Sequence, residues 1–454
     1  MTVSPTPRPP RKRPSPVLIG GVTVALIAGA VAGATAVSST QTAAMMNGNT
    51  ATMRQALEAT GFAHITEHQY QRGFMSSTET MTVLVGPDED RVKLKVTNRI
   101  QHGPLPGLRT LANAVIDTDV QFADAKVQAA FEKALGGKRP EIRTVIGLTG
   151  STSTSVNVPA GQFADGADMV RWQPLTGTYR ASGRTTDLNF ALPTVTVSGD
   201  GTTVSVNGVR LSGKTTKRDA KDPLGVGDSA FTIDSVSAGD GIGARGIRVS
   251  SNASDAGGQF YGGTVKYDVG SVSVPGLNLK NLQLHVSARH LARDPLVRLA
   301  RAFEAMQQDA RQGKATPTLT KAQEDALMAD VLALLQGAPV IAVDRLSVEQ
   351  PSGTVTLDAV ATLPDAKGID AATLKASPEV LLAGLNVRAN LIGREQAVRE
   401  LLTLVDPGGR QGLAANLSGL VEAGMLERRG DNLNATLNYG AGRVTLNGQD
   451  LGAF

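Results

Sequence analysis

The sequence contains no cysteine. Disulfide bonds, thiolate metal sites and cysteine nucleophiles are therefore excluded. Aromatic residues are also scarce: they make up 4% of the chain, and Trp172 is the only tryptophan. Few flat side chains are thus available to stack against sugars or unpaired bases. We expect neither a disulfide-stapled scaffold nor a protein that binds nucleic acid by stacking.

A strong excess of charge is also missing. The net charge of +4 arises from Arg8, Arg11, Lys12 and Arg13, which precede every acidic residue, and the rest of the chain carries 41 basic and 41 acidic residues. A balanced chain has no long-range field that attracts polyanions, so no nucleic-acid partner is expected. With 454 residues, 41% of them hydrophobic and 19% charged, the chain is globular and long enough for one large or two medium domains.

One long uncharged run is present near the start. Residues 17–37 read VLIGGVTVALIAGAVAGATAV, and 21 residues in a helix cross a hydrocarbon core of about 30 Å. Basic residues precede this run and no charge follows it until Arg54, which places the N-terminus in the cytoplasm and the C-terminus outside. The sequence therefore predicts a cytoplasmic tail over 1–16, a single-pass transmembrane helix over 17–37 and a linker over 38–49.

The predicted location is the bacterial cytoplasmic membrane, with the C-terminal part on the periplasmic side of the cell envelope. The lipid bilayer is thus an expected partner through the N-terminal helix. A cleaved signal peptide is the alternative, because the small residues at 32–34 and 34–36 resemble processing sites. Gly29 and Gly33 have the spacing that lets two membrane helices approach closely, so a homo-oligomer stays open.

Alternation of apolar and polar residues with period two dominates the exported part and is typical of β-hairpins. It predicts a β-rich region over 50–290, followed by an α+β region over 291–454 that continues it. The clearest hairpins turn at 199–201, 207–208, 351–353 and 440–442. The fold class is therefore α+β, with mainly antiparallel meanders and peripheral helices that cover one face of the sheets.

Helix signals are few and specific. A short helix is expected from about residue 50 to 60. Asp294 and Pro295 form a cap followed by a proline at the first helical position, and Thr320 with Gln323 forms a capping box for a helix that ends near Gly337. Two further helices are predicted over residues 394–404 and 413–426.

Three nucleotide or metal motifs match in letters but lack the structure that their chemistry needs. Residues 208–215 fit the phosphate-binding pattern GxxxxGK[ST] and residues 241–246 fit GxGxxG, yet neither leads into a helix. Residues 64–68 fit HxxEH, but this segment is predicted to be extended, which places the two histidines about 13 Å apart. We therefore expect no cofactor and no metal.

Three stretches carry a family resemblance: residues 70–77 (YQRGFMSS), residues 101–106 (QHGPLP) and the ending from Leu420 to Gly448. In these the chain resembles the YdgA-like family of bacterial envelope proteins of unknown function. The resemblance implies an N-terminal membrane anchor and an exported domain, and it supplies no catalytic residue. We interpret the motif residues as structural, with His102 as the one functional question: Tyr70, Gly73, Ser77, His102, Gly103 and Pro104.

Three functions stay open at this point. The leading hypothesis is a non-enzymatic envelope protein that contacts another envelope protein or the cell wall. The second is a lipid-handling protein whose curved sheet presents an apolar groove to acyl chains. The third is an exported hydrolase, for which only His102 offers a candidate centre.

Overall fold

The computed structural model describes most of the chain after residue 62. The described residues are 63–85, 92–108, 110–166, 168–199, 201–219, 222–239, 241–311, 319–364, 366–377, 379–405, 412 and 416–453. The predicted tail, transmembrane helix, linker and the helix at 50–60 lie outside them. Among the described helices none is long and apolar enough to cross a membrane.

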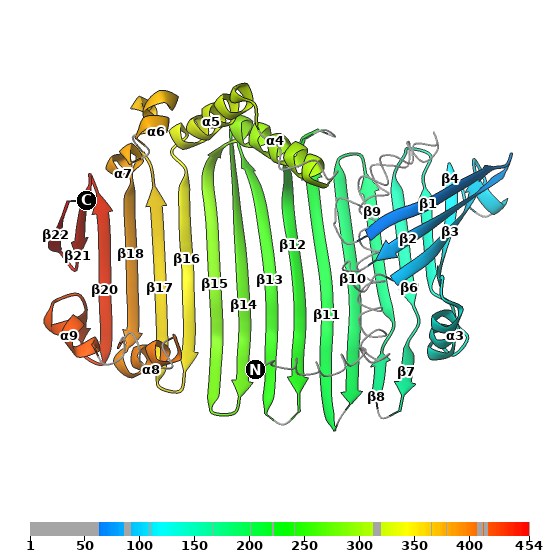
Figure 1. Cartoon of the computed structure of the whole chain (residues 1–454), viewed down its shortest axis with the longest axis horizontal. Coiled ribbons are helices and arrows are strands. Elements are labelled where there is room, and N and C mark those ends of the chain that lie inside the picture. The colour runs from blue at the N-terminus through cyan, green and yellow to red at the C-terminus, as the bar shows by residue number, and fades with distance from the viewer. Residues whose placement is uncertain are drawn as a thin grey trace, which may run out of the picture.

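The strands of the described residues form a single 22-stranded sheet in which all pairings are antiparallel. Pairing runs from β1 in sequence order to β6, then through β9 and β10 to β18, and on through β20 to β22. Strand β10 pairs with β9 over its first half and with β8 over its second. The result is one long sheet that spans the molecule (Figure 1).

The strands before the long central meander are β1 (Ala63–Arg72), β2 (Ser76–Val85), β3 (Val92–His102), β4 (Ala114–Phe122), β5 (Glu141–Ile146), β6 (Thr152–Val158), β7 (Gly161–Asp165), β8 (Asp168–Trp172) and β9 (Leu175–Ser182). The central strands are β10 (Thr185–Gly199), β11 (Thr202–Lys217), β12 (Gly225–Ala238), β13 (Ile242–Ala256), β14 (Phe260–Val274) and β15 (Leu277–Ala292). The last are β16 (Val340–Gln350), β17 (Gly353–Thr362), β18 (Asn386–Arg394), β19 (Glu427–Arg429), β20 (Asn432–Gly440), β21 (Arg443–Leu446) and β22 (Gln449–Ala453).

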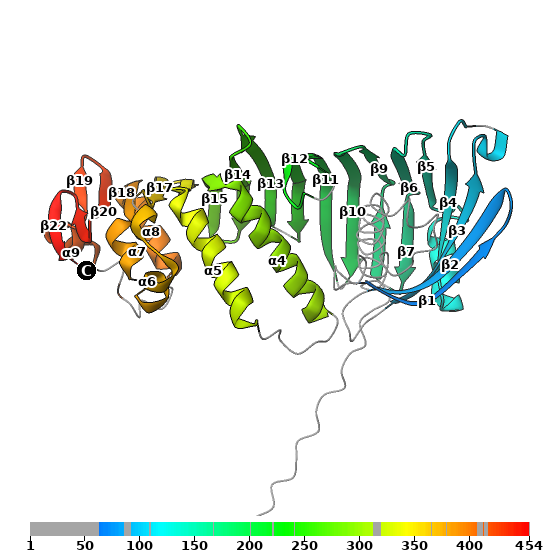
Figure 2. The same cartoon turned by 90° about the horizontal axis from the view of Figure 1, so that it is seen from above.

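The helices occupy connections between strands. They are α3 (Ala125–Ala134), α4 (Arg293–Arg311), α5 (Lys321–Gln336), α6 (Ala371–Ala376), α7 (Val380–Gly384), α8 (Glu395–Val405) and α9 (Leu417–Glu422), with 3-10 turns η1 (Pro106–Leu108) and η2 (Ala366–Gly368). Helices α4 to α8 and strands β1 to β3 stand out from the sheet toward the same side (Figure 2).

Most local predictions are confirmed. The hairpin turns at 199–201, 351–353 and 440–442 join β10 to β11, β16 to β17 and β20 to β21. Helix α4 begins at Arg293, two residues before the predicted first position at Pro295, so that Asp294 and Pro295 both lie in its first turn. Helix α5 begins with the predicted capping box, in which the N–H of Gln323 donates to Thr320 Oγ1. Helix α8 lies one residue later at each end than the predicted helix over 394–404, whereas α9 is shorter than the predicted helix over 413–426.

The hairpin predicted at 207–208 is wrong. Asn207 and Gly208 lie inside β11, which continues for nine residues beyond Gly208. Gly208 has φ +67° and is skipped in the pairing with both neighbours, while the register is the same before and after it. Asp234, Gly246, Gly270 and their neighbours are skipped at the same level of the adjoining strands. The glycine suits this interruption of the ladder for the same reason that it suits a turn, since both need a positive φ at that position.

The expectation that helices cover one face of the sheet is only partly right. Helix α8 contacts β17, β18 and β20, but the longer helices α4 and α5 contact each other and, within the sheet, mainly β15. Both helices belong to the connection between β15 and β16 and lie at the ends of these strands (Figure 1). The central strands are therefore left without a helical layer among the described residues.

Candidate functional site: the open apolar face of the sheet

The two faces of the central sheet differ in chemistry. In β11 and β12 the apolar side chains alternate with polar ones, and the antiparallel register places like residues opposite one another. One face consequently carries rows of apolar residues that cross many strands. The longest, here called the central row, contains Phe190, Leu211, Phe231, Val249, Tyr267, Leu284, Leu346, Leu357, Leu391 and Ala435.

Further apolar rows run beside the central row on the same face. One contains Val265, Val286, Val343, Ala359, Ala389, Leu437 and Leu446. A second lies past the level at which Gly208, Asp234, Gly246 and Gly270 leave the pairing, and it contains Trp172, Val195, Val206, Val236, Ala244, Val272 and Leu279. We refer to these three rows together as the apolar face. They contain no charged residue.

The two ends of the apolar face are closed by the protein itself. At the β10 end, β1 to β4 fold over it, and Met81, Val83 and Phe122 pack in one core with Val156 and Phe190. At the β20 end, Val398 of α8 and Leu417 of α9 pack on Leu433, which is fully buried. Both closures lie on the side to which the helices project (Figure 2).

Between these ends no described helix or strand covers the apolar face. Tyr267 is 48% exposed, and Phe231 and Leu346 are exposed as well. Neighbouring strands lie about 4.8 Å apart, so the central row from β10 to β20 extends on the order of 40 Å. Single exposed apolar residues are ordinary, whereas a continuous surface of this length marks an interaction site.

The opposite face is polar and its groups pair with each other. Arg210 donates two hydrogen bonds to Asp234, at 2.9 and 2.8 Å, and His285 Nε2 lies 2.9 Å from Asp268 Oδ1. Asn252 Nδ2 donates to Asp228 Oδ1 at 2.9 Å. Cross-strand pairs of this kind suit a surface that stays in water.

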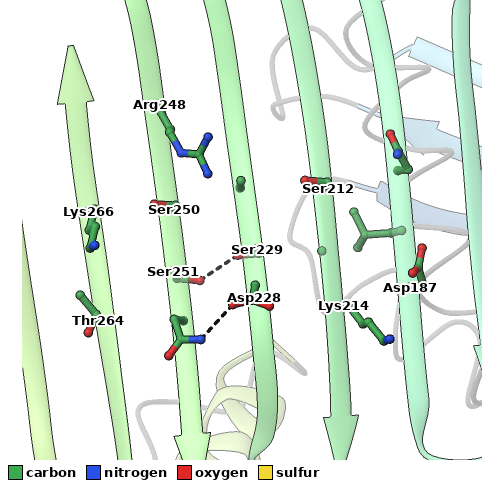
Figure 3. Close-up of a pocket in the computed structure, with 15 residues that line it drawn as sticks. Asp187, Ser212, Lys214, Asp228, Ser229, Arg248, Ser250, Ser251, Thr264 and Lys266 are labelled. Carbon is green, nitrogen blue, oxygen red and sulfur yellow. Dashed lines mark hydrogen bonds between the residues drawn. The ribbon is translucent and has the colours of Figure 1, made fainter. Parts of the chain in front are cut away.

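A shallow hollow of about 470 Å³ lies over the polar side chains of β10 to β14. Figure 3 shows Asp187, Lys214, Asp228, Arg248 and Lys266 spread over separate strands, without a cluster of carboxylates or a nucleophile beside a base. Among the described residues there is also no group of three metal-ligating side chains. The residues that line this hollow therefore do not form a reaction centre.

None of the segments with nucleotide and metal motifs leads into a helix, and the segment at 64–68 is extended, as predicted. Residues 208–215 lie inside β11, and residues 242–246 begin β13. His64 and His68 lie on β1, where His68 Nε2 is 2.8 Å from Glu79 Oε1. Glu79 also accepts a hydrogen bond from Asn98 Nδ2 at 2.8 Å. His68 therefore belongs to a cross-strand polar network of β1, β2 and β3.

The structure brings the six family-motif residues together at one end of β1 to β3. Tyr70, Gly73, His102, Gly103 and Pro104 line a hollow of about 490 Å³. Ser77, the sixth, reaches His102 through a hydrogen bond of 2.8 Å between Ser77 Oγ and His102 Nε2. The sequence separation of 25 residues gives no hint of this contact, because it depends on the register of β2 against β3.

A serine beside a histidine invites comparison with a hydrolase, but the geometry fits a structural role. Ser77 is only 4% exposed, which leaves its hydroxyl out of reach of a substrate. The same hydroxyl is also 3.4 Å from the backbone nitrogen of Gly73. The backbone N–H of His102 donates to the Met75 carbonyl at 2.8 Å. Together these contacts hold the β1–β2 turn against the end of β3.

One buried group of charges lies away from both sites. Arg293, at the start of α4, donates a hydrogen bond to Asp222 and faces Asp255 at 3.4 Å. Burial raises the pKa of Asp222, but hydrogen bonds from the Leu224 N–H and from Arg293, with the charge of Arg293, outweigh it and hold the pKa below its ordinary value. Burial also raises the pKa of Tyr261, helped by the charge of Asp222. This cluster fixes α4 to the connection between β11 and β12.

Comparison with known proteins identifies the family and nothing closer. No curated protein and no solved structure matches the chain. A family model described as "Bacterial protein of unknown function (DUF945)" matches residues 17–452. Since this match covers almost the whole chain, including every strand from β1 to β21, the protein belongs to this bacterial family.

Proposed function

We propose that the protein is a non-enzymatic, YdgA-like envelope protein that binds the acyl chains of lipids along its apolar face. In this proposal residues 17–37 anchor the chain in the cytoplasmic membrane and the sheet lies on the exported side. The observation that carries it is the open central row, which is uncharged and exposed between its two closed ends.

The size of the apolar face suits an acyl chain. A bilayer core of about 30 Å holds two acyl chains end to end, so the central row, on the order of 40 Å long, exceeds the length of one chain. The rows offer almost only hydrocarbon, and a ligand without polar groups loses nothing by contact with them. A lipid head group could stay in water at the edge of the sheet.

A protein partner suits the apolar face less well. Specific protein interfaces combine an apolar centre with hydrogen bonds, about one per 100 to 200 Å². The backbone of the central strands is already paired on both sides, so an added strand finds no free edge there. The polar face, where hydrogen-bonding groups are plentiful, is the more suitable surface for a protein or cell-wall contact.

Native mass spectrometry of the full-length chain, extracted with its surrounding lipid in polymer nanodiscs rather than detergent, tests the proposal. We expect phospholipid to remain bound after the polymer is removed. A matched variant with Tyr267→Asp and Leu346→Asp keeps residues 17–37 and should lose that lipid. A lipid-free mass for the unaltered chain, or equal lipid in both proteins, would refute acyl-chain binding by the sheet.

A further inference from the structure

Three turns meet at the end of the molecule that is farthest from the C-terminus (Figures 1 and 2). They connect β1 to β2, β3 to β4 and β5 to β6. The His102 N–H donates to the Met75 carbonyl at 2.8 Å, and the Asn113 N–H donates to the Ile146 carbonyl at 2.8 Å. Asn113 Nδ2 also donates to the Gly147 carbonyl at 3.1 Å. These bonds join the three turns into one surface.

Each of these turns exposes large apolar side chains. Phe74 is 99% exposed, and Met75 beside it and Leu111 in the second turn are each about two-thirds exposed, at 67% and 66%. Leu105 and Leu148 add two further exposed side chains. We call these five residues the apolar tip. A phenylalanine that is almost fully exposed does not stabilise the core, so we expect it to contact another molecule.

The family-motif residues hold the turns that carry the apolar tip. A Cβ atom on Gly73 would lie 2.2 Å from the Ser76 carbonyl oxygen, and one on Gly103 would lie 1.9 Å from the Ala112 carbonyl oxygen. The Ser77–His102 hydrogen bond ties the first turn to the second. The backbone is thus fixed while the apolar side chains point outward, which is the arrangement of a preorganised contact surface.

The composition of the three turns points to a lipid surface as the partner. Residues 73–76, 103–113 and 147–151 contain no aspartate or glutamate, and the exposed Arg72 immediately precedes the first turn. An aromatic ring, aliphatic side chains and a basic residue suit the boundary between head groups and acyl chains, where anionic lipids attract arginine. An acidic residue, which anionic lipid would repel, does not occur in these segments.

We infer that the apolar tip inserts into the lipid–water interface of a membrane and fixes that end of the sheet to the bilayer surface. Phe74, Met75 and Leu111 enter the outer edge of the hydrocarbon, and Arg72 lies at the level of the head groups. This contact is separate from acyl-chain binding by the apolar face, and either one holds without the other.

Tryptophan fluorescence in vesicles tests this inference. The full-length chain carrying Phe74→Trp or Leu111→Trp is reconstituted into vesicles of phosphatidylethanolamine and phosphatidylglycerol with brominated acyl chains. Trp172, the only native tryptophan, is 3% exposed and serves as the internal reference. Leu451→Trp, half exposed at the opposite end of the molecule, is the matched control.

We expect a blue-shifted emission and strong quenching from the tryptophans at 74 and 111, and neither effect at 451. Thermal unfolding of each variant should match that of the original chain, because the replaced side chains are exposed. If the tryptophans at 74 and 111 are quenched no more than the one at 451, the tip does not enter the bilayer and the inference fails. Lipid binding at the apolar face is measured separately and would not be affected by that result.

Discussion

A single charge on the apolar face should weaken lipid binding by a calculable amount. Leu346 lies in the central row between Leu284 and Leu357 and is 45% exposed. One strand spacing of about 4.8 Å spans about four methylene groups of an acyl chain, and burial of a methylene contributes about 0.8 kcal/mol. Because the apolar face covers an acyl chain from one side only, about half of the surface of these methylene groups is buried. The contact with one strand therefore contributes about 1.5 kcal/mol to the binding free energy. Leu346→Asp should therefore raise the dissociation constant about tenfold.

The assay is a titration of the delipidated full-length chain with a fluorescent fatty acid. The matched control is Ile392→Asp, because Ile392 is 51% exposed but lies on the polar face, opposite Thr356 and Asn434. We expect no change in affinity for that variant. Equal affinity for Leu346→Asp and the original chain, or equal weakening by both substitutions, would refute the argument that the central row is the binding surface.

The remaining predictions concern the buried charges around Arg293, the glycine inside β11 and His102. Asp222→Ala removes the hydrogen-bonded carboxylate partner of the buried Arg293 and leaves only Asp255 beside it. It should lower the free energy of unfolding by up to about 3 to 5 kcal/mol, measured by denaturant titration; a loss below about 1 kcal/mol would contradict the buried pair. Because the pKa of Asp222 is lowered in the folded state, its contribution is complete above the ordinary value of 3.8 and is lost as the pH falls below it, so a pH series should show a steeper acid loss for the original chain than for Asp222→Ala. Gly208→Ala should destabilise more than Gly201→Ala, because both positions have positive φ but only at Gly208 would the Cβ meet the Asp234 carboxylate; equal losses would contradict this steric argument. His102→Gln should leave acyl-chain binding at the apolar face unchanged, since His102 lies beyond that face, and a loss of the bound phospholipid in native mass spectra would contradict this.

Local elements were predictable wherever a few adjacent residues decide the structure. The capping box of Thr320 and Gln323 and the turn at 199–201 are examples. Asn207–Gly208 shows the limit, because the same two residues suit a hairpin turn or an interruption inside one long strand. The choice depends on the neighbouring strands, where Asp234 and Gly246 leave the ladder at the same level.

The candidate site was predictable only in part. Period-two alternation shows that each strand has an apolar side, but the sequence does not say whether helices cover it. Helices α4 and α5 have apolar residues that suit a covering layer. They lie at the ends of β15 and β16, however, and largely pack on each other. Likewise Phe74 is visible in the sequence as a turn residue, but its exposure depends on how the turns of β1–β2 and β3–β4 are held by Ser77 and His102.

The central claim is that lipid lies on the apolar face of the sheet, and crosslinking in intact cells tests it most directly. A photoreactive phenylalanine analogue replaces Tyr267 on the apolar face in one protein and Ile392 on the polar face in another; the two side chains are 48% and 51% exposed. We predict that irradiation attaches phospholipid at position 267 and not at position 392. Crosslinks from position 267 to protein, including a second copy of this chain, without any lipid would contradict the account.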